Sequence, residues 1–394
     1  MPFEFATATR IVFGPGVFKE IGALAAGMGR RALVIANRLD SHRTLIDALA
    51  AQGQPLIAWL AGQGVKTTVM VVAAEPTVDV VREGTQLGRG SGCDVVIGLG
   101  GGSAMDTAKA VSVLLANRGD PLNYLEVVGQ GHPITERAAP CIAIPTTAGT
   151  GAEVTANAVL EAPEQRVKAS LRSPLMLPRV ALVDPLLTLG VPPPLTASTG
   201  LDALTQLIEP FTSIRANPLT DALCREGMQR AARSLRRAYE QGDDAAARED
   251  MSLASLFSGM ALANAKLGVV HGLASVIGGM FHAPHGAICA SLLPHAMAIN
   301  IRALQARHPT SAALARYDEI ARLLTGSQQA RGADGVAWVQ DLVSALSIPR
   351  LGAYGVTAQD FPTLIEKASA ASSTKGNPIA LTAEEMEEIL NRAV

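Results

Sequence analysis

The pattern of apolar and polar positions changes near the middle of the chain. Before about residue 187, short apolar runs rich in β-branched residues alternate with stretches of helical periodicity. The expected strands are 32–36, 68–72, 94–99, 141–144 and 180–183, and the expected helices include 43–51, 78–87 and 104–116. Short buried strands that alternate with helices predict a parallel sheet covered on both faces. Such a sheet binds ligands beyond the carboxyl ends of its strands.

After this point the pattern is nearly all helical. The proline-dense stretch 191–194 restricts the backbone and is expected to break both helix and strand, which places a boundary at 187–195. Segments 211–239, 243–264 and 312–324 fit a period of 3.6 residues, while 245–248 and 328–332 are expected at surface corners. The fold class predicted is an α/β domain with a parallel sheet over residues 1–187, followed by an all-helical domain over 188–394.

Composition narrows the classes of partner. The chain has 394 residues, of which 48% are hydrophobic and 17% charged, so it can bury a large core. A net charge of −2 and only 4% aromatic residues argue against a nucleic-acid partner. No apolar run reaches the roughly 18 residues of a spanning helix, and the first residues lack a signal-peptide pattern. We therefore expect no membrane partner and a cytoplasmic location.

The four cysteines are scattered along the chain without a C-x-x-C pair. That spacing argues against a disulfide framework and against a thiolate zinc site. We expect reduced thiols that are mostly buried in the core.

A glycine-rich loop follows the strand expected at 94–99 and opens the next helix. Its sequence is GLGGGSAMDTAK over residues 98–109. Glycines let the backbone approach a phosphate, and a helix N-terminus presents free N–H groups and the positive end of its dipole. The pattern indicates a pyrophosphate site, although it is not the G-x-G-x-x-G fingerprint. The residues expected to contact a cofactor here are Gly100, Gly101, Gly102, Ser103 and Asp106.

A second loop, PTTAGTGAEVT over residues 145–155, follows the strand expected at 141–144. Hydroxyl groups and glycines at the carboxyl end of a strand can bind phosphate oxygens or a nicotinamide amide, and Thr146, Thr147 and Thr150 are the candidates. Either loop alone is also compatible with a plain turn. Two such loops on one parallel sheet predict a grip on a dinucleotide from two sides.

Histidines gather in the helical half, where four of the seven fall inside 25 residues. A helix over 271–281 that ends before Pro284 would carry His271, with His285 on the following turn. If 199–206 is helical, Asp202 and Gln206 share one face at the i,i+4 spacing by which a helix presents two ligands to a metal. These four residues form the predicted metal site, and purely structural histidines are the alternative.

Six motifs in order give the chain a resemblance to a known family. They are RIVFGPG at 10–16, GGGSAMDTAK at 100–109, PTTAGTGAEVT at 145–155, TGLDAL at 199–204, GVVHG at 268–272 and PHG at 284–286. Across essentially its full length, the chain resembles the iron-containing (group III) alcohol dehydrogenases. The resemblance implies a dinucleotide-binding α/β domain, an all-helical metal- and substrate-binding domain with the active site between them, and a homodimer or larger homo-oligomer.

The resemblance also assigns roles residue by residue. It implies that the two loops bind the cofactor, that Asp202, His271 and His285 are metal ligands, and that Lys168 lies near the active site. Two positions depart from the family pattern: Gln206 and Ser275 stand where the family usually has histidines. An amide oxygen is a weaker donor than imidazole for Fe(II) or Zn(II).

Three further residues bear on the reaction. The proton is expected to leave through Ser275, a water or the cofactor ribose, and His282, three residues before His285, is a candidate to compensate for the missing histidine. After the first strand the chain continues Asn37-Arg38, without the carboxylate that often binds the ribose hydroxyls of NAD. NAD is the expected cofactor, with NADP tolerated.

The function predicted is interconversion of a small alcohol and its aldehyde or ketone by hydride transfer, with Fe(II), or alternatively Zn(II), as a Lewis acid. One alternative is a metal-independent reductase of an oxoacid, similar to the maleylacetate reductases, which Gln206 favours and Asp202 argues against. Another is a lyase or cyclase resembling dehydroquinate synthase, but residues 260–295 supply only Lys266 as a cation for a phosphorylated substrate. The third is a non-catalytic structural subunit that binds a cofactor.

Overall fold

The structure is a computed structural model that describes residues 2–39, 44–73, 75–126, 128–165 and 167–394. It contains two compact units. The α/β unit comprises Ala6–Thr147 and Gly151–Thr188, and the helical unit comprises Leu189–Val394 together with Met1–Phe5 and Ala148–Thr150. The main division therefore lies beside the predicted boundary at 187. Part of the second loop, including Thr150, groups with the helical unit instead of the α/β unit.

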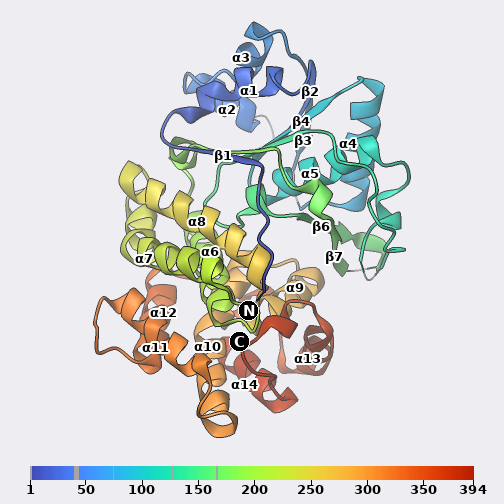
Figure 1. The fold of residues 1–394 in the computed structure, drawn as a ribbon. Coiled ribbons are helices and arrows are strands. Elements are labelled where there is room, and N and C mark those ends of the chain that lie inside the picture. The colour runs from blue at the N-terminus through green and yellow to red at the C-terminus, as the bar shows by residue number, and fades with distance from the viewer. Residues whose placement is uncertain (1, 40–43, 74, 127, 166) are drawn as a thin grey trace. The chain divides into compact units, whose positions relative to one another are not determined.

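A six-stranded parallel sheet forms the centre of the α/β unit (Figure 1). Its strand order is β1 (Arg10–Phe13), β8 (Val180–Val183), β5 (Cys141–Pro145), β4 (Val95–Gly100), β2 (Arg31–Asn37) and β3 (Lys66–Val72). The five expected strands are confirmed, and β1 is additional. From β2 the chain moves outward to β3 and then crosses back past β2 to β4. The carboxyl ends of β2 and β4 therefore form the switch point at which sheets of this kind bind ligands.

Helices cover both faces of this sheet, as the buried strands predict. Along β2, Val34 packs into the core on one face, whereas Leu33 and Ile35 pack into the core on the other. The first core includes residues of α1 (Ile21–Ala26), α2 (Leu45–Ala51) and α3 (Leu56–Gly62). The second core includes residues of α4 (Val78–Gly90), α5 (Gly102–Ala116) and the antiparallel hairpin of β6 (Asn157–Ala162) and β7 (Val167–Arg172). Residue 43 of the helix expected at 43–51 lies outside the described residues.

The helical unit is built from nine described helices around one large core. They are α6 (Pro193–Thr212), α7 (Pro218–Glu240), α8 (Ala245–Ala265), α9 (Val269–Phe281), α10 (His285–Arg307), α11 (Ala312–Thr325), α12 (Gly332–Ala345), α13 (Phe361–Ala370) and α14 (Ala383–Ala393). The helices expected at 243–264, 271–281 and 312–324 are confirmed as α8, α9 and α11.

Three expectations for this half were wrong. Segment 211–239 is not one helix, because Asn217 caps the backbone N–H groups of Leu219 and Thr220 and Pro218 starts α7. Residues 245–248 are not a surface corner but the first turn of α8, which Asp244 caps. The prolines at 191–194 were expected to break both helix and strand, but Pro193 is the first residue of α6. Proline is tolerated there because the first N–H groups of a helix have no partner within the helix.

Among the described helices, α10 alone is long and apolar enough by itself to cross a membrane. In this structure, 78% of its most apolar window is buried inside the helical unit. The pair α8 and α9 passes the same test together but is bent by 100°. The burial of α10 is that of a core helix of a globular unit.

Candidate active site

The glycine loop lies at the switch point of the sheet. Strand β4 ends at Gly100, whose φ of 148° lies in a region that residues with a Cβ rarely adopt. A Cβ built there would lie 2.0 Å from Asn37 Oδ1, at the end of β2. That oxygen accepts the N–H of Gly101 at 2.8 Å, and no described side chain caps the start of α5. The first N–H groups of α5 therefore remain available to an anion such as a phosphate.

The start of the second loop lies beside the first. The N–H of Thr146 donates to the carbonyl of Gly100 at 2.9 Å. The hydroxyl oxygen of Thr147 is 3.5 Å from the position that a Cβ on Gly101 would take. Adjacent strands β4 and β5 thus bring Thr146 and Thr147 to the glycine loop, and the predicted contact of these two residues with a cofactor stays a prediction.

The carboxylate of Asp106 forms a hydrogen bond and an ion pair within the protein. Its Oδ2 accepts the N–H of Val159 at 3.0 Å, and its carboxylate pairs with Lys109 at 2.9 Å. Lys109 is fully buried and also donates to Thr155 Oγ1 at 2.8 Å. Asp106 therefore ties α5 to the β6–β7 hairpin, and its predicted contact with a cofactor stays a prediction.

Four side chains of the helical unit form a group that could hold a metal ion. Asp202 comes from α6, His271 from α9, and His285 and Cys289 from α10, and one ligand atom of each lies within 4.8 Å of the others. His285 is the first residue of α10 and not part of a separate turn. Its neighbour Gly286 lets α10 approach α6 closely, because a Cβ there would lie 2.2 Å from the carbonyl oxygen of Ser198.

Two ligand atoms in this group are buried and lack a hydrogen-bond partner among the described residues. They are Asp202 Oδ1 and His271 Nε2, on residues that are only 2% and 5% exposed. The two atoms lie 3.4 Å apart, which is longer than a charge-assisted hydrogen bond. A buried polar atom without a partner is costly. A divalent cation between them would satisfy both, so the residues fit such an ion.

The electrostatics of the group favour positive charge. Burial works to lower the pKa of His271, but Cys289, Asp202 and Glu209 outweigh it and hold that pKa well above its usual range. The same competition, with Cys289 and Asp202 against desolvation, raises the pKa of His285 to about 9. Burial works to raise the pKa of Asp202, yet His285 and His271 hold it below its usual value. A site that stabilises imidazolium in this way would also stabilise a bound cation.

Glu209 is a site residue that the sequence analysis missed. Its carboxylate lies 2.7 Å from His271 Nδ1 and also accepts the N–H of Val270 at 2.7 Å. A carboxylate on Nδ1 places the proton there and leaves Nε2 as the acceptor that faces the group. Glu209 follows Asp202 by two helical turns on α6, and this i,i+7 spacing was the signal that could have identified it.

The position of Gln206 differs from that of the predicted ligands. Its Nε2 donates to Asp202 Oδ2 at 3.0 Å, and its Oε1 accepts the hydroxyl of Ser258 at 2.9 Å. Both ends of the amide are therefore used inside the helical unit. This geometry holds Asp202 in place and does not present the amide oxygen to the other three predicted ligands.

Cys289 has a place in the site that the sequence does not reveal. The expectation of reduced and mostly buried thiols is confirmed, since all four cysteines are free and three are buried. The Sγ of Cys289, however, lies 3.6 Å from His285 Nε2 and belongs to the four-residue group. Cys289 follows His285 by one helical turn, and the search for C-x-x-C pairs could not detect this His–Cys spacing.

Two family models together match most of the chain. The family described as iron-containing alcohol dehydrogenase matches residues 8–185, and the C-terminal family of Fe-containing alcohol dehydrogenases matches residues 196–394. The chain belongs to the iron-containing alcohol dehydrogenase family. It is therefore an enzyme of a family that contains iron and depends on NAD.

Individual relatives of this family cover most or all of the chain. Alcohol dehydrogenase 4 of Saccharomyces cerevisiae is 38% identical over 319 residues, which are 81% of this chain and 80% of the relative. The crystal structure of a 1,3-propanediol oxidoreductase has a TM-score of 0.90 at 32% identity and covers 100% of both chains. Sulfoacetaldehyde reductase from Bifidobacterium kashiwanohense, solved in complex with NAD+, has a TM-score of 0.85 at 27% identity and covers 100% of this chain and 99% of its own.

The three residues proposed for catalysis are not members of the metal group. Lys168, on β7 of the α/β unit, pairs with Glu75 at 3.3 Å. Ser275 is exposed on α9, and its hydroxyl donates to the carbonyl of Gly272 at 3.0 Å. His282 is exposed just after α9, with a positive φ of 51°. Their roles stay predictions.

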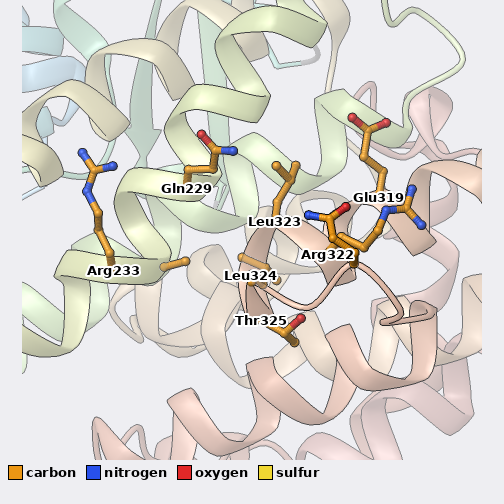
Figure 2. A pocket seen from close by; sticks show the side chains of 10 residues that line it. Gln229, Arg233, Glu319, Arg322, Leu323, Leu324 and Thr325 are labelled. Carbon is orange, nitrogen blue, oxygen red and sulfur yellow. The ribbon is translucent and has the colours of Figure 1, made fainter.

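A pocket of about 640 Å³ opens elsewhere on the helical unit, between α7 and α11 (Figure 2). It is lined by Gln229, Ala232, Arg233, Glu319, Arg322, Leu323, Leu324, Thr325, Gly326 and Gln328. None of these lining residues belongs to the metal group or to the predicted site.

Proposed function

We propose that this enzyme is an NAD(P)-dependent dehydrogenase that interconverts a small alcohol and its aldehyde or ketone at a divalent metal centre. The observation that carries the proposal is the pair of buried, unpartnered ligand atoms, Asp202 Oδ1 and His271 Nε2, in one group with His285. The relatives support the substrate class, because their names include an alcohol dehydrogenase, a 1,3-propanediol oxidoreductase and a sulfoacetaldehyde reductase.

Each residue of the centre has a distinct task in this proposal. When bound, a divalent cation supplies Lewis-acid stabilisation of charge on the substrate oxygen, and a nicotinamide supplies or accepts the hydride. Asp202, His271 and His285 hold the cation. Glu209 keeps the proton of His271 on Nδ1, and Gln206 fixes the orientation of the Asp202 carboxylate.

Proton exchange with solvent is assigned to groups outside this set. We propose Ser275 as the first route, with His282 as the alternative, because both side chains are exposed. Lys168 is proposed to act near the reacting groups through its charge. Ser275→Ala and His282→Ala are expected to change the pH profile of kcat, and an unchanged profile in both would assign the exchange to water or to the cofactor ribose.

The α/β unit is proposed to bind the dinucleotide phosphates at the start of α5, between Gly100 and Ser103, with Thr146, Thr147 and Thr150 as further contacts. Asn37 holds the glycine loop and provides no carboxylate to repel a 2′-phosphate, and the exposed Arg38 follows it. We propose NAD(H) as the cofactor, with NADP(H) accepted. The ratio of kcat/KM for NADH and NADPH measures this preference.

The metal requirement is the decisive test. We propose Fe(II), with Zn(II) as the alternative, and expect near-stoichiometric metal in protein purified without oxygen or chelator. Aldehyde-dependent NADH oxidation should be lost with the metal after dialysis against a chelator and return when the metal is restored. Full turnover without metal would instead support the metal-independent oxoacid reductase that Gln206 favours, and oxoacids would be the substrates to assay.

We also propose that the enzyme is a homodimer or larger homo-oligomer in the cytoplasm. Strand β3 is an edge of the sheet, and its Val69 is 42% exposed, which suits a surface covered by a second copy. The four free cysteines suit a reducing compartment. Light scattering of the purified protein tests the first statement, and cell fractionation tests the second.

A further inference from the structure

Cys289 places a sulfur atom at the proposed metal centre. The residue is fully buried on α10, one helical turn after His285, and its Sγ lies 3.6 Å from His285 Nε2. This i,i+4 spacing allows one helix to direct two side chains at the same ion. Asp202 and His271, from α6 and α9, provide the other two members of the group.

Three of the six distances within the group are close to those between the ligands of one ion, and all six are within 4.8 Å. Metal–ligand bonds of about 2.0–2.3 Å at tetrahedral angles place two ligand atoms about 3.3–3.6 Å apart. The structure has 3.4 Å from Asp202 Oδ1 to His271 Nε2 and 3.7 Å from Asp202 Oδ1 to His285 Nε2. The separation of the Cys289 sulfur from His285, 3.6 Å, has the same length. The carboxylate–imidazole separations are too long for charge-assisted hydrogen bonds.

We propose that Cys289, as a thiolate, is the fourth protein ligand of the divalent cation in this enzyme. The inference rests on the metal centre of the proposed function and names its ligand set as Asp202, His271, His285 and Cys289. Gln206 is then a positioning residue, because its amide nitrogen, which can only donate, faces Asp202 while its oxygen accepts from Ser258. The unpartnered atoms of Asp202 and His271 point to the same ion independently of the sulfur.

A thiolate ligand has consequences for metal choice and access. Soft sulfur ligands favour Zn(II) over Fe(II), and Zn(II) also lies above Fe(II) in the general order of affinities. A zinc ion held by four protein ligands would have to become five-coordinate to bind a substrate oxygen, as catalytic zinc sometimes does. The side chain of His285 is 39% exposed and marks the open side of an otherwise buried group.

The wild-type protein provides the first test. In the zinc-loaded enzyme, X-ray absorption should detect one sulfur neighbour at about 2.3 Å from the metal. In the cobalt-substituted enzyme, the near-ultraviolet spectrum should contain a sulfur-to-cobalt charge-transfer band. Coordination by nitrogen and oxygen alone would overturn the inference, and this result does not depend on the folding of any variant.

Matched cysteine variants provide the second test. Cys289→Ser should remove the sulfur signal and weaken zinc binding at least about tenfold. Cys224→Ser changes another buried, free cysteine of the helical unit and should leave both properties unchanged. With equimolar Zn(II) and Fe(II), the bound ratio should shift toward iron in Cys289→Ser only. An unchanged ratio and affinity in that variant would contradict a thiolate ligand.

A variant of Gln206 and the possible outcomes for bound metal distinguish the ligand role of Cys289 from the metal-dependent function itself. Gln206→Leu should keep the sulfur signal, whereas loss of that signal with retained metal would contradict the ligand set. Bound metal without sulfur coordination would overturn only the role of Cys289. If no metal binds and turnover survives a chelator, the proposed function fails as well.

Discussion

The glycine loop of the α/β unit and the metal group of the helical unit are built in opposite ways. The loop offers backbone N–H groups from one strand-to-helix turn, where Gly100 ends β4 and α5 begins two residues later. The metal group consists of side chains from three helices: α6 carries Asp202 and is distant in sequence from the consecutive helices α9 and α10, which carry His271 and the pair His285 and Cys289. A site made of backbone is encoded in a continuous motif, whereas a site made of side chains exists only after the helices have packed.

This difference determines how each site responds to substitution. In the loop, a new side chain acts through steric overlap and backbone strain, and the N–H donors themselves remain. In the metal group, a substitution removes a ligand or the residue that orients it, and the partner left behind is buried. We therefore expect larger effects in the helical unit.

The largest effect is expected for His271→Ala. This change removes a buried ligand whose Nε2 faces the group and leaves Glu209 Oε2 without its histidine partner. Bound metal should fall to background, and kcat/KM should fall by roughly a thousand-fold or more, because Lewis-acid stabilisation contributes several kcal/mol. Metal analysis and aldehyde-dependent NADH oxidation on the same preparation measure both effects.

His308→Ala is the matched control for that variant, since His308 is an exposed histidine that follows α10 and lies outside the metal group. Its metal content and turnover should equal those of the wild type. Circular dichroism should show that both variants keep their helices. Unchanged turnover in a folded His271→Ala protein would argue against a metal centre at this position.

The two sites also differ in how far the sequence predicts them. The five expected strands and the glycine loop follow from local patterns, because buried parallel strands and their turns are determined by residues near in sequence, whereas the strand order that creates the switch point does not. In the helical half, spacing identified Asp202, and His271 and His285 stood in a visible cluster. The break between α6 and α7 was missed because the helical periodicity of 211–239 outweighed the capping signal of Asn217-Pro218.

The remaining members of the metal group could not be predicted in the same way. Gln206 has the spacing of a ligand, yet its amide is turned to Asp202 and Ser258, and the choice between these arrangements depends on how α6 packs against α8. Glu209 on α6 contacts Nδ1 of His271 on α9, a contact that exists only once the two helices have packed. Cys289 was placed among the core thiols because its partner is a histidine and not a second cysteine. Contacts between helices determine these roles, and a single sequence does not display them.

Gly100→Ala should have the next largest effect and would test the backbone character of the loop. The added Cβ would overlap Asn37 Oδ1 at 2.0 Å on a backbone with φ of 148°. We expect NADH binding to weaken about 10- to 100-fold, because strain of this kind costs about 1–3 kcal/mol, while metal content stays at the wild-type level. Titration calorimetry with NADH measures the first, and metal analysis the second.

Gly90→Ala is the control for the loop variant. Gly90 ends α4 in the same unit, and a Cβ there would meet open space. Its affinity for NADH should match the wild type. If Gly100→Ala lost metal as strongly as it lost NADH, the backbone site and the side-chain site would not respond separately to substitution.

Glu209→Gln should have a smaller effect within the metal group. The amide oxygen can still accept a hydrogen bond, but it no longer supplies the negative charge that holds the proton on His271 Nδ1. We expect metal affinity to fall about 10-fold and kcat/KM at saturating metal to fall less. Competition with a calibrated chelator measures the affinity. A loss as large as that in His271→Ala would indicate that Glu209 does more than position the histidine.

The smallest expected effect is a pH dependence of Tm that arises from His285 in the helical unit. In the metal-free enzyme the pKa of His285 is raised to about 9, above its unfolded value of 6.5. The protonated form therefore contributes stability that is fully present below pH 6.5 and is lost as the pH rises through about 9. We expect Tm of the metal-free protein to fall by a few degrees over this range.

Metal binding needs neutral imidazoles, so the affinity for the metal should rise with pH, and the metal-loaded protein should show little of this loss of stability. Calorimetry at both ends of the range measures the change, and His308→Ala should keep it. His285→Ala should reduce it, and an equal fall of Tm in this variant would assign the titration to other groups, His271 with its raised pKa among them.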